Sequence, residues 1–165
     1  MINKSPLWTC PQSLMGSYSY FYDEYHNDVA QLVERFKKIA NPHIVSIYRG
    51  SLPLGVHLSN IFKCPLSIVK YQSRDGEDSQ AEWLLNLTGD KKLHPKFFPE
   101  LIVVDDIYDT GETFRAVLDL PEFNNNPNYR AIALFGNPND DGVLYLNEQV
   151  YRWIVFPWER VKGGM

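Results

Sequence analysis

The chain has 165 residues, of which 44% are hydrophobic, so one domain with a sizeable core is expected without help from a disulfide or a structural metal. Folding at this length buries about 70% of the unfolded surface, which excludes the mini-protein scaffolds. The 20 acidic side chains outnumber the 16 Lys and Arg and give a formal charge of -4, so the sequence offers no broad basic field for nucleic acid.

Cysteine usage and the first residues of the chain favour the cytoplasm. Cys10 and Cys64 lie far apart and form no C-x-x-C pattern, which suits a reducing compartment. Pro6 and Pro11 interrupt the first residues, so no signal peptide is expected. No apolar run approaches the roughly 18 residues of a membrane span, and a soluble protein is predicted.

Helical and strand patterns alternate along the chain. Apolar residues at helical spacing predict a helix over 28–40, capped by Asn27 or Asp28 and stopped by Asn41 and Pro42. Further strands and helices follow in turn: strands at 43–48, 66–71, 101–105 and 129–135, helices at 54–62 and 114–118. This order predicts an α/β fold with a mostly parallel twisted sheet flanked by helices, where ligands bind beyond the carboxyl ends of the strands.

The polar stretch 72–81 has no periodic pattern. It fits a mobile flap over a site and equally an ordinary exposed loop.

The segment LIVVDDIYDTGETF at 101–114 carries the strongest chemical signal. Four apolar residues run directly into Asp105 and Asp106, and a Thr-Gly-x-Thr turn then opens a helix. Backbone N–H groups and hydroxyls of residues 110–113 would form a cradle for a phosphate monoester. Ionised carboxylates only accept hydrogen bonds, which suits the two vicinal hydroxyls of a ribose or a hard divalent cation. A phosphorylated ribose satisfies both halves of the segment, whereas a simple helix cap does not explain two adjacent acids at the end of a buried strand.

The run VVDDIYDTGET resembles the signature of the type I phosphoribosyltransferases, which use 5-phosphoribosyl 1-diphosphate as donor. The resemblance implies that Asp105 and Asp106 contact the ribose hydroxyls and Mg2+, and that Asp109 lies near the base as the candidate proton acceptor. It implies a 5-phosphate loop that consists of Thr110, Gly111, Glu112 and Thr113, in which Glu112 holds a variable position.

Upstream, IVSIYRGSLPLG at 44–55 is similar to the pyrophosphate loop of the purine enzymes. Arg49 would then clamp the diphosphate, because a guanidinium offers donors in a fixed geometry to phosphate oxygens. Gly50 and Ser51 would let the backbone approach closely, and Ser51 stands where relatives usually have glycine. Taken alone, an Arg-Gly turn is commonly just a connection between a strand and a helix.

Downstream, LFGNPND at 134–140 and YRWIVFPWE at 151–159 resemble the base-binding end of the bacterial xanthine-guanine enzymes. By this likeness Trp153 stacks on the purine, the main chain at Ile154 meets its edge, and Glu159 provides a further metal carboxylate. Without the upstream motifs, a core role would be the better interpretation of Trp153. The resemblance implies one domain over 1–165, with a core at about 28–135 and a hood from about 136–160 plus the amino-terminal segment.

One position departs from the close relatives. They have a lysine that contacts the 6-oxo group of the purine, and the aligned residue here is Asn137. An ammonium only donates hydrogen bonds, whereas an amide both donates and accepts, so Asn137 could face a 6-oxo or a 6-amino edge. Guanine, xanthine and hypoxanthine stay favoured, and adenine stays possible.

The resulting hypothesis is a Mg2+-dependent purine phosphoribosyltransferase of nucleotide salvage that acts as a homodimer or homotetramer. Two alternatives stay open. One is a transferase for adenine or a pyrimidine. The other is a non-catalytic regulator with the same fold that controls RNA or DNA, although the acidic balance argues against such a module.

Overall fold

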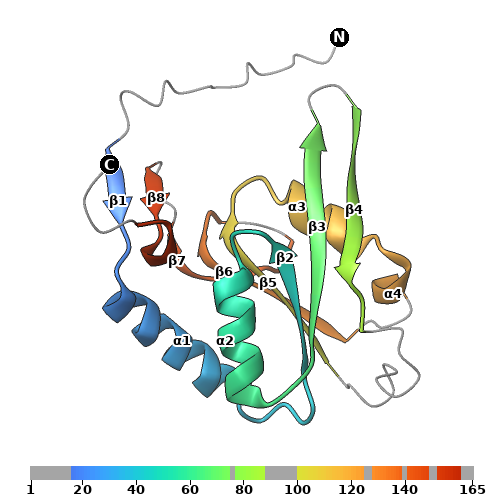
Figure 1. Ribbon diagram of the computed structural model, residues 1–165, viewed down its shortest axis with the longest axis horizontal. Coiled ribbons are helices and arrows are strands. Elements are labelled where there is room, and N and C mark those ends of the chain that lie inside the picture. Colours follow the sequence, from blue (N-terminus) through green and yellow to red (C-terminus); the bar gives the residue numbers. More distant parts are fainter. Residues whose placement is uncertain are drawn as a thin grey trace.

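Six strands form the central sheet, in the order β4-β3-β2-β5-β6-β7 (Figure 1). The computed structural model describes residues 16–74, 77–87, 100–124, 128–138, 141–148 and 152–160. The sheet strands are β2 (His43–Tyr48), β3 (Leu66–Arg74), β4 (Glu77–Leu85), β5 (Leu101–Tyr108), β6 (Tyr129–Gly136) and β7 (Leu144–Glu148). Every neighbouring pair is parallel except β3 with β4, which confirms the expected mostly parallel sheet.

Helices cover both faces of this sheet. They are α1 (Tyr22–Phe36), α2 (Leu52–Phe62), α3 (Glu112–Leu118) and α4 (Pro121–Asn124). Successive strand residues point to opposite faces, so β2 and β5 supply both cores. Ile44 and Ile102 pack with α1 and α2, while Val45 and Val103 pack with α3 and α4. Near-continuous apolar strands are typical of a parallel sheet that is buried on both faces.

Helix α1 begins at Tyr22 and ends at Phe36, so the sequence-based boundaries of 28–40 are wrong. The start is set by Glu24, whose carboxylate accepts a hydrogen bond of 2.9 Å from the backbone N–H of Phe21. Acidic residues in the first turn also interact favourably with the positive end of the helix dipole. Asp28 therefore lies inside the helix and caps nothing, and its side chain is buried.

Residues 72–81 are not a loop, because most of them belong to the antiparallel hairpin of β3 and β4. Tyr71 pairs with Ala81, and Arg74 pairs with Glu77. The hairpin projects past the carboxyl end of β2 (Figure 1). Alternation of polar and apolar residues was too weak in this stretch to indicate a strand from the sequence.

The two ends of the described chain meet in a second, smaller sheet. Strand β1 (Ser17–Ser19) pairs in parallel with β8 (Trp153–Val155), and a 3-10 turn over Pro157–Glu159 follows. We call this small sheet with its 3-10 turn the hood. Tyr20 packs edge-on against Phe135 and Phe156 and joins the hood to the main core. No helix in the described part of the chain is long and apolar enough to cross a membrane.

Candidate functional site

The carboxyl end of β5 holds two adjacent carboxylates. Leu101 to Val104 are fully buried, and Asp105 is still only 7% exposed. The backbone N–H of Asp106 donates to Asp105 Oδ1 over 2.9 Å, and the N–H of Ile107 donates to Asp106 Oδ1 over 2.9 Å. Each carboxylate is therefore held by the backbone of the residue that follows it.

Burial raises the pKa of both groups. For Asp105, desolvation is the largest cause and the neighbouring charge of Asp106 adds to it, so its pKa lies well above the ordinary value. Desolvation also raises the pKa of Asp106, and the negative charge of Glu159 contributes. A cation at this position would stabilise the ionised forms of both carboxylates and offset the cost of their burial.

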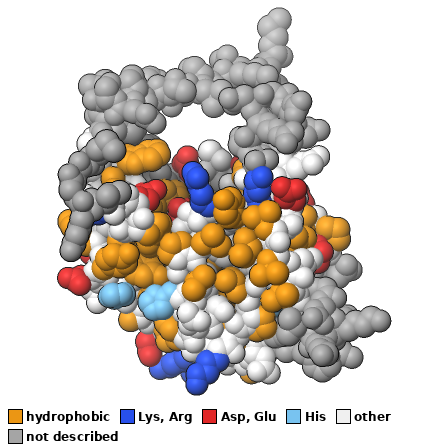
Figure 2. Space-filling model, in the orientation of Figure 1, with side chains coloured by type: hydrophobic (Ala, Val, Ile, Leu, Met, Phe, Trp, Pro, Cys, Tyr) orange, Lys and Arg blue, Asp and Glu red, His pale blue; other side chains and the backbone are white. Residues whose placement is uncertain are grey.

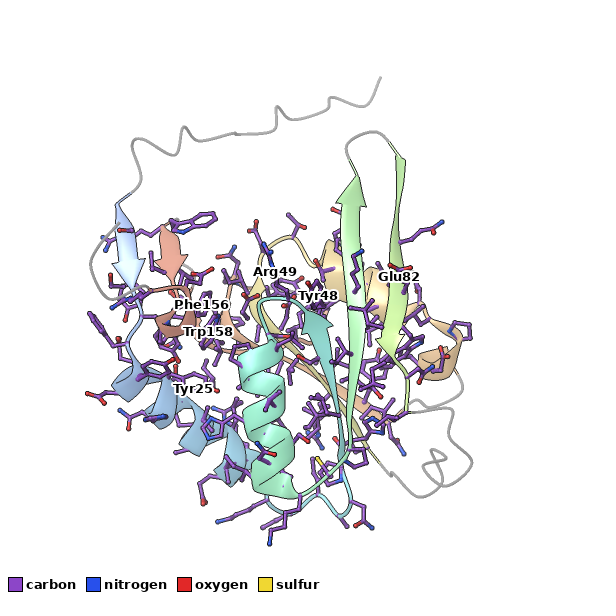
Figure 3. All side chains as sticks on the ribbon, viewed as in Figure 1. Tyr25, Tyr48, Arg49, Glu82, Phe156 and Trp158 are labelled. Atoms are coloured by element: carbon purple, nitrogen blue, oxygen red, sulfur yellow. The ribbon has the colours of Figure 1, made fainter. Side chains whose placement is uncertain are left out.

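The loop after β2 lies directly against these acids. A Cβ built on Gly50 would be 2.6 Å from the carboxyl carbon of Asp106, so a side chain at that position would displace the carboxylate or the turn. Arg49 is exposed and rises from the end of β2 on the side where the hairpin and the hood project (Figure 3). The structure thus brings the Arg-Gly turn and the acid pair together, although they lie more than 50 residues apart in the chain.

Ser51 differs from its neighbours in this loop because its side chain is fully buried. Its hydroxyl donates to the carbonyl oxygen of Ile47 over 2.6 Å and lies 2.8 Å from Ser46 Oγ. The hydroxyl is therefore used inside the turn, and Ser51 as a whole residue is 0% exposed, so it presents no open surface to a ligand.

The loop between β5 and α3 turns at Gly111, which has a φ of 77°. This left-handed conformation favours glycine. Its Cα is also tightly enclosed, since a Cβ there would lie 2.5 Å from Tyr108 Oη and 2.9 Å from Arg115 Nη1. Three of the four residues expected in the phosphate loop are accessible: Thr110 and Glu112 are exposed and Thr113 is half-buried.

Three side chains outside the candidate residues predicted from the sequence hold this loop. Arg115 Nη2 donates to the carbonyl oxygen of Thr110 over 2.7 Å, and Arg115 Nη1 donates to Asp141 Oδ2 over 2.6 Å. The hydroxyl of Tyr108 donates to the same Asp141 oxygen over 2.6 Å. Asp141 follows a different strand, and no spacing along the chain links it to Arg115.

The carboxyl ends of β5 and β6 meet through two residues of the expected base site. Asn137 Nδ2 donates to Asp109 Oδ1 over 3.3 Å, and the backbone N–H of Asn137 donates to the carbonyl oxygen of Tyr108 over 3.3 Å. The candidate reader of the purine edge and the candidate proton acceptor are therefore in contact.

The hood supplies the aromatic residues. Trp153 is 62% exposed, so its face is available to a planar ligand, whereas Ile154 is buried. Trp158 instead is half-buried, packs against the core and stacks on Phe156 at a centroid distance of 4.8 Å. A cavity of about 390 Å³ opens between the hood and the ends of β6 and β7. Its lining consists of Tyr18, Phe135, Asn147, Glu148, Arg152 and Ile154.

The described residues contain no group of three or more His, Cys, Asp or Glu side chains that could hold a metal. Asp105 and Asp106 do present carboxylate oxygens, the hard ligands that Mg2+ prefers. Glu159 is exposed and acts on Asp106 by its charge. Because Mg2+ usually binds through one or two carboxylates and substrate phosphates, the donor set fits an ion that enters with its substrate.

Known proteins share this architecture. The family model described as "Phosphoribosyl transferase domain" matches residues 22–159. Comparison of the sequence with curated proteins gives no match. A purine phosphoribosyltransferase from Pyrococcus horikoshii has a TM-score of 0.70 at 24% identity and covers 89% of this chain and 96% of its own.

Two further solved structures with a similar fold are named for different purine bases. The xanthine-guanine-hypoxanthine phosphoribosyltransferase of Helicobacter pylori has a TM-score of 0.70 at 22% identity, covering 87% of this chain and 94% of its own. An adenine phosphoribosyltransferase from Thermoanaerobacter pseudethanolicus has a TM-score of 0.57 at 16% identity, covering 78% and 82%. At these identities the likeness concerns the fold.

Proposed function

The chain belongs to the phosphoribosyl transferase domain family, and from that premise we propose that it transfers the 5-phosphoribosyl group of 5-phosphoribosyl 1-diphosphate to a purine base. Guanine, xanthine and hypoxanthine are the favoured bases, and the products are a nucleoside 5-monophosphate and diphosphate. The observation that carries this proposal is the contact of Gly50 with Asp106, which joins an exposed arginine to an acid pair at one edge of the sheet.

The donor is held at three places. Asp105 and Asp106 accept hydrogen bonds from the two ribose hydroxyls, and the loop over 110–113 binds the 5-phosphate through backbone N–H groups and hydroxyls. Arg49 binds the diphosphate with its guanidinium, which matches phosphate oxygens in geometry and charge. Its exposed position beside the acid pair supports this role.

Mg2+ bound with the donor would neutralise charge on the departing diphosphate. Asp105 and Asp106 would hold it, together with Glu159 from the hood. The raised pKa of each aspartate supports this assignment, because an ion there would compensate carboxylates that the fold buries at a cost.

The base is held between the hood and the ends of β5 and β6. Trp153 stacks on the purine, and the main chain at Ile154 meets its edge. A ring nitrogen of the purine forms a bond to C1 of the ribose as the bond from C1 to the diphosphate oxygen breaks. Asp109 accepts the proton that leaves the ring nitrogen, and Asn137 faces the 6-position. The contact between Asn137 and Asp109 supports a common site for both.

Two alternative functions predict other results in an assay of diphosphate release. Solved structures with this fold include adenine and orotate phosphoribosyltransferases, so another base is the first alternative. The exposed Trp153 supports a planar bicyclic base. A regulator that binds the donor and transfers nothing is the second alternative, and the formal charge of -4 leaves it little room for a basic face that would bind nucleic acid.

A homo-oligomer in the cytoplasm is part of the same proposal. Apolar side chains gather on the face of the molecule that carries α2 (Figure 2), where Val56 is 46% exposed and Ile61 is 41% exposed. A patch of this kind on a surface helix is typical of an interface. Light scattering of the wild type and of Val56→Glu tests it: a monomeric wild type would contradict it.

Diphosphate release tests the activity. Purified protein is mixed with Mg2+ and 5-phosphoribosyl 1-diphosphate, and with guanine, xanthine, hypoxanthine, adenine or uracil in separate wells. Release with 6-oxopurines supports the proposal, and release with adenine or uracil alone supports the first alternative. Donor binding by calorimetry without release for any base supports the regulator.

A further inference from the structure

Asp141 lies outside every motif recognised in the sequence, yet it contacts two residues that surround the loop after β5. Its Oδ2 accepts hydrogen bonds of 2.6 Å from both Tyr108 and Arg115. Tyr108 is the last residue of β5, and Arg115 is the middle residue of α3. The carboxylate therefore joins the end of the strand to the helix across the loop between them.

The Arg115 guanidinium also contacts the loop directly. Arg115 Nη2 donates to the carbonyl oxygen of Thr110 over 2.7 Å, while the backbone N–H of Arg115 donates to the carbonyl oxygen of Gly111 over 2.9 Å. The N–H groups of a planar guanidinium have a fixed geometry, so two such hydrogen bonds fix both the position and the orientation of the side chain. Hydrogen bonds with a charged partner are also stronger than those between neutral groups. Without Asp141, the long Arg115 side chain would regain its rotamer freedom.

The neighbouring groups show that the arrangement is closely packed. A Cβ at Gly111 would meet both Tyr108 Oη and Arg115 Nη1, so the loop has no room to shift toward them. Asp141 itself follows β6, so it ties the loop to a third part of the fold.

We propose that Asp141 is a positioning residue for the binding of 5-phosphoribosyl 1-diphosphate. It locks Arg115, so that the loop from Asp109 to Gly111 is held in its binding conformation. This inference rests on the proposed function, because it takes that loop as part of the donor site. Asp141 touches no substrate, and it acts through Arg115 and Tyr108.

The test compares Asp141→Asn with the wild type in steady-state kinetics. The variant keeps the shape of the side chain and loses its charge. The KM for 5-phosphoribosyl 1-diphosphate should rise about tenfold, the value of one charge-assisted hydrogen bond, while the KM for the base stays unchanged. Asp141→Glu should recover part of the loss, and Tyr108→Phe should show a smaller rise than Asp141→Asn.

Glu100→Gln is the matched control. It removes a carboxylate that pairs with another exposed arginine, Arg130, at the amino ends of β5 and β6, on the opposite edge of the sheet. Its KM for the donor should equal that of the wild type. A similar rise in both variants would show a general loss of structure and overturn the proposal.

Amide hydrogen exchange of the protein without ligand separates this proposal from the proposed function. Peptides over 108–118 should exchange faster in Asp141→Asn than in the wild type, with no change in the β2 peptides. Unchanged exchange and an unchanged donor KM in an active enzyme would overturn the positioning role. A wild type without activity for any base, but with faster exchange in the variant, would contradict the proposed function and leave the loop contact intact.

Discussion

Asn137 Nδ2 donates a hydrogen bond to Asp109 Oδ1 over 3.3 Å, which brings together two residues from the ends of neighbouring strands. In the proposed reaction one faces the 6-position of the base and the other accepts its proton. A change at either residue is therefore expected to affect the other, and their variants are best compared as a pair.

Asn137→Lys should sharpen the preference for 6-oxopurines. An ammonium only donates, so it favours a 6-oxo group over a 6-amino group, and it would also pair with Asp109. The ratio of kcat/KM for hypoxanthine to that for adenine should rise about tenfold or more, since each 1.4 kcal/mol is a factor of ten. Asn128→Lys adds the same charge just before β6, at the opposite end of that strand, and should leave the ratio unchanged. An unchanged ratio in Asn137→Lys would contradict its role at the base.

Asp109→Asn should lower kcat by about 100-fold to 10,000-fold, which is the usual contribution of a general base. The amide has the same shape but accepts no proton at neutral pH, so donor binding by calorimetry should change little. Asp119→Asn provides the control, because Asp119 is an exposed carboxylate at the other end of α3. A wild-type kcat in Asp109→Asn would remove Asp109 from the reaction.

Much of the fold follows from the sequence because parallel strands buried on both faces appear as uninterrupted apolar runs. The strand predicted at 43–48 has the observed bounds of β2, and the runs at 101–105 and 129–135 lie within β5 and β6. The hairpin was missed because its strands are polar and partly exposed, so the period of two is weak. The start of α1 was missed because a Glu24 carboxylate, rather than a typical cap residue, satisfies the first N–H group.

Part of the candidate site could also be predicted from the sequence, and part of it could not. Asp105, Asp106 and the 110–113 loop are contiguous in sequence, so a local motif identifies them. Asp141 is 26 residues from Arg115, and only the three-dimensional structure brings them together. The buried hydroxyl of Ser51 shows the opposite case, since a residue expected at a ligand uses its side chain to close a turn.

Gly50→Ala should reduce both activity and stability. The added methyl group would overlap the Asp106 carboxylate, so either the Arg49 turn or the acid pair has to move. Overpacking of this kind costs about 1–3 kcal/mol in the free energy of unfolding, and an ångström of displacement at a site costs about 100-fold in rate. Gly16→Ala introduces the same methyl group where no atom lies within 4 Å, and it should behave as the wild type. Chemical denaturation and steady-state assays measure the two effects, and full activity in Gly50→Ala would refute the contact.

Asp105→Asn should stabilise the protein at neutral pH although it impairs activity. The folded state raises the pKa of Asp105, so it binds this proton more tightly than the unfolded chain does. The contribution of Asp105 to stability is then fully present below its pKa in the unfolded chain and is lost as the pH rises toward its pKa in the folded protein. The amide removes this loss and still accepts the hydrogen bond from the Asp106 N–H.

The measurement is the difference in Tm between Asp105→Asn and the wild type, without Mg2+. It should be near zero at about pH 4 and grow toward pH 7, above the ordinary pKa of an aspartate. Burial lowers the pKa of His43 to about 4, so protonation of His43 destabilises both proteins below the ordinary pKa of histidine and cancels in this difference. A difference that does not change with pH would show that Asp105 is not buried in its charged form.

Tyr20→Phe should loosen the hood from the sheet. The Tyr20 hydroxyl donates to Asp28 Oδ2 over 2.6 Å, and Asn147 Nδ2 donates to the same oxygen over 2.7 Å. Loss of one donor leaves a buried carboxylate less satisfied, at a cost of about 1–3 kcal/mol in the free energy of unfolding. Tyr22→Phe removes a hydroxyl from a side chain that is 53% exposed, and its cost should be close to zero.

The Tyr20 variant also tests whether the hood holds the base. Tyr20 is the residue after β1, and its N–H donates to the carbonyl oxygen of Val155, next to Ile154 in β8. Because the hood carries Trp153 and Ile154, Tyr20→Phe should raise the KM for the base and leave the KM for 5-phosphoribosyl 1-diphosphate unchanged. Asp141→Asn is expected to show the reverse pattern. A rise in both KM values for both variants would mean that the two halves of the site respond as one unit, and the separate roles of hood and loop would have to be abandoned.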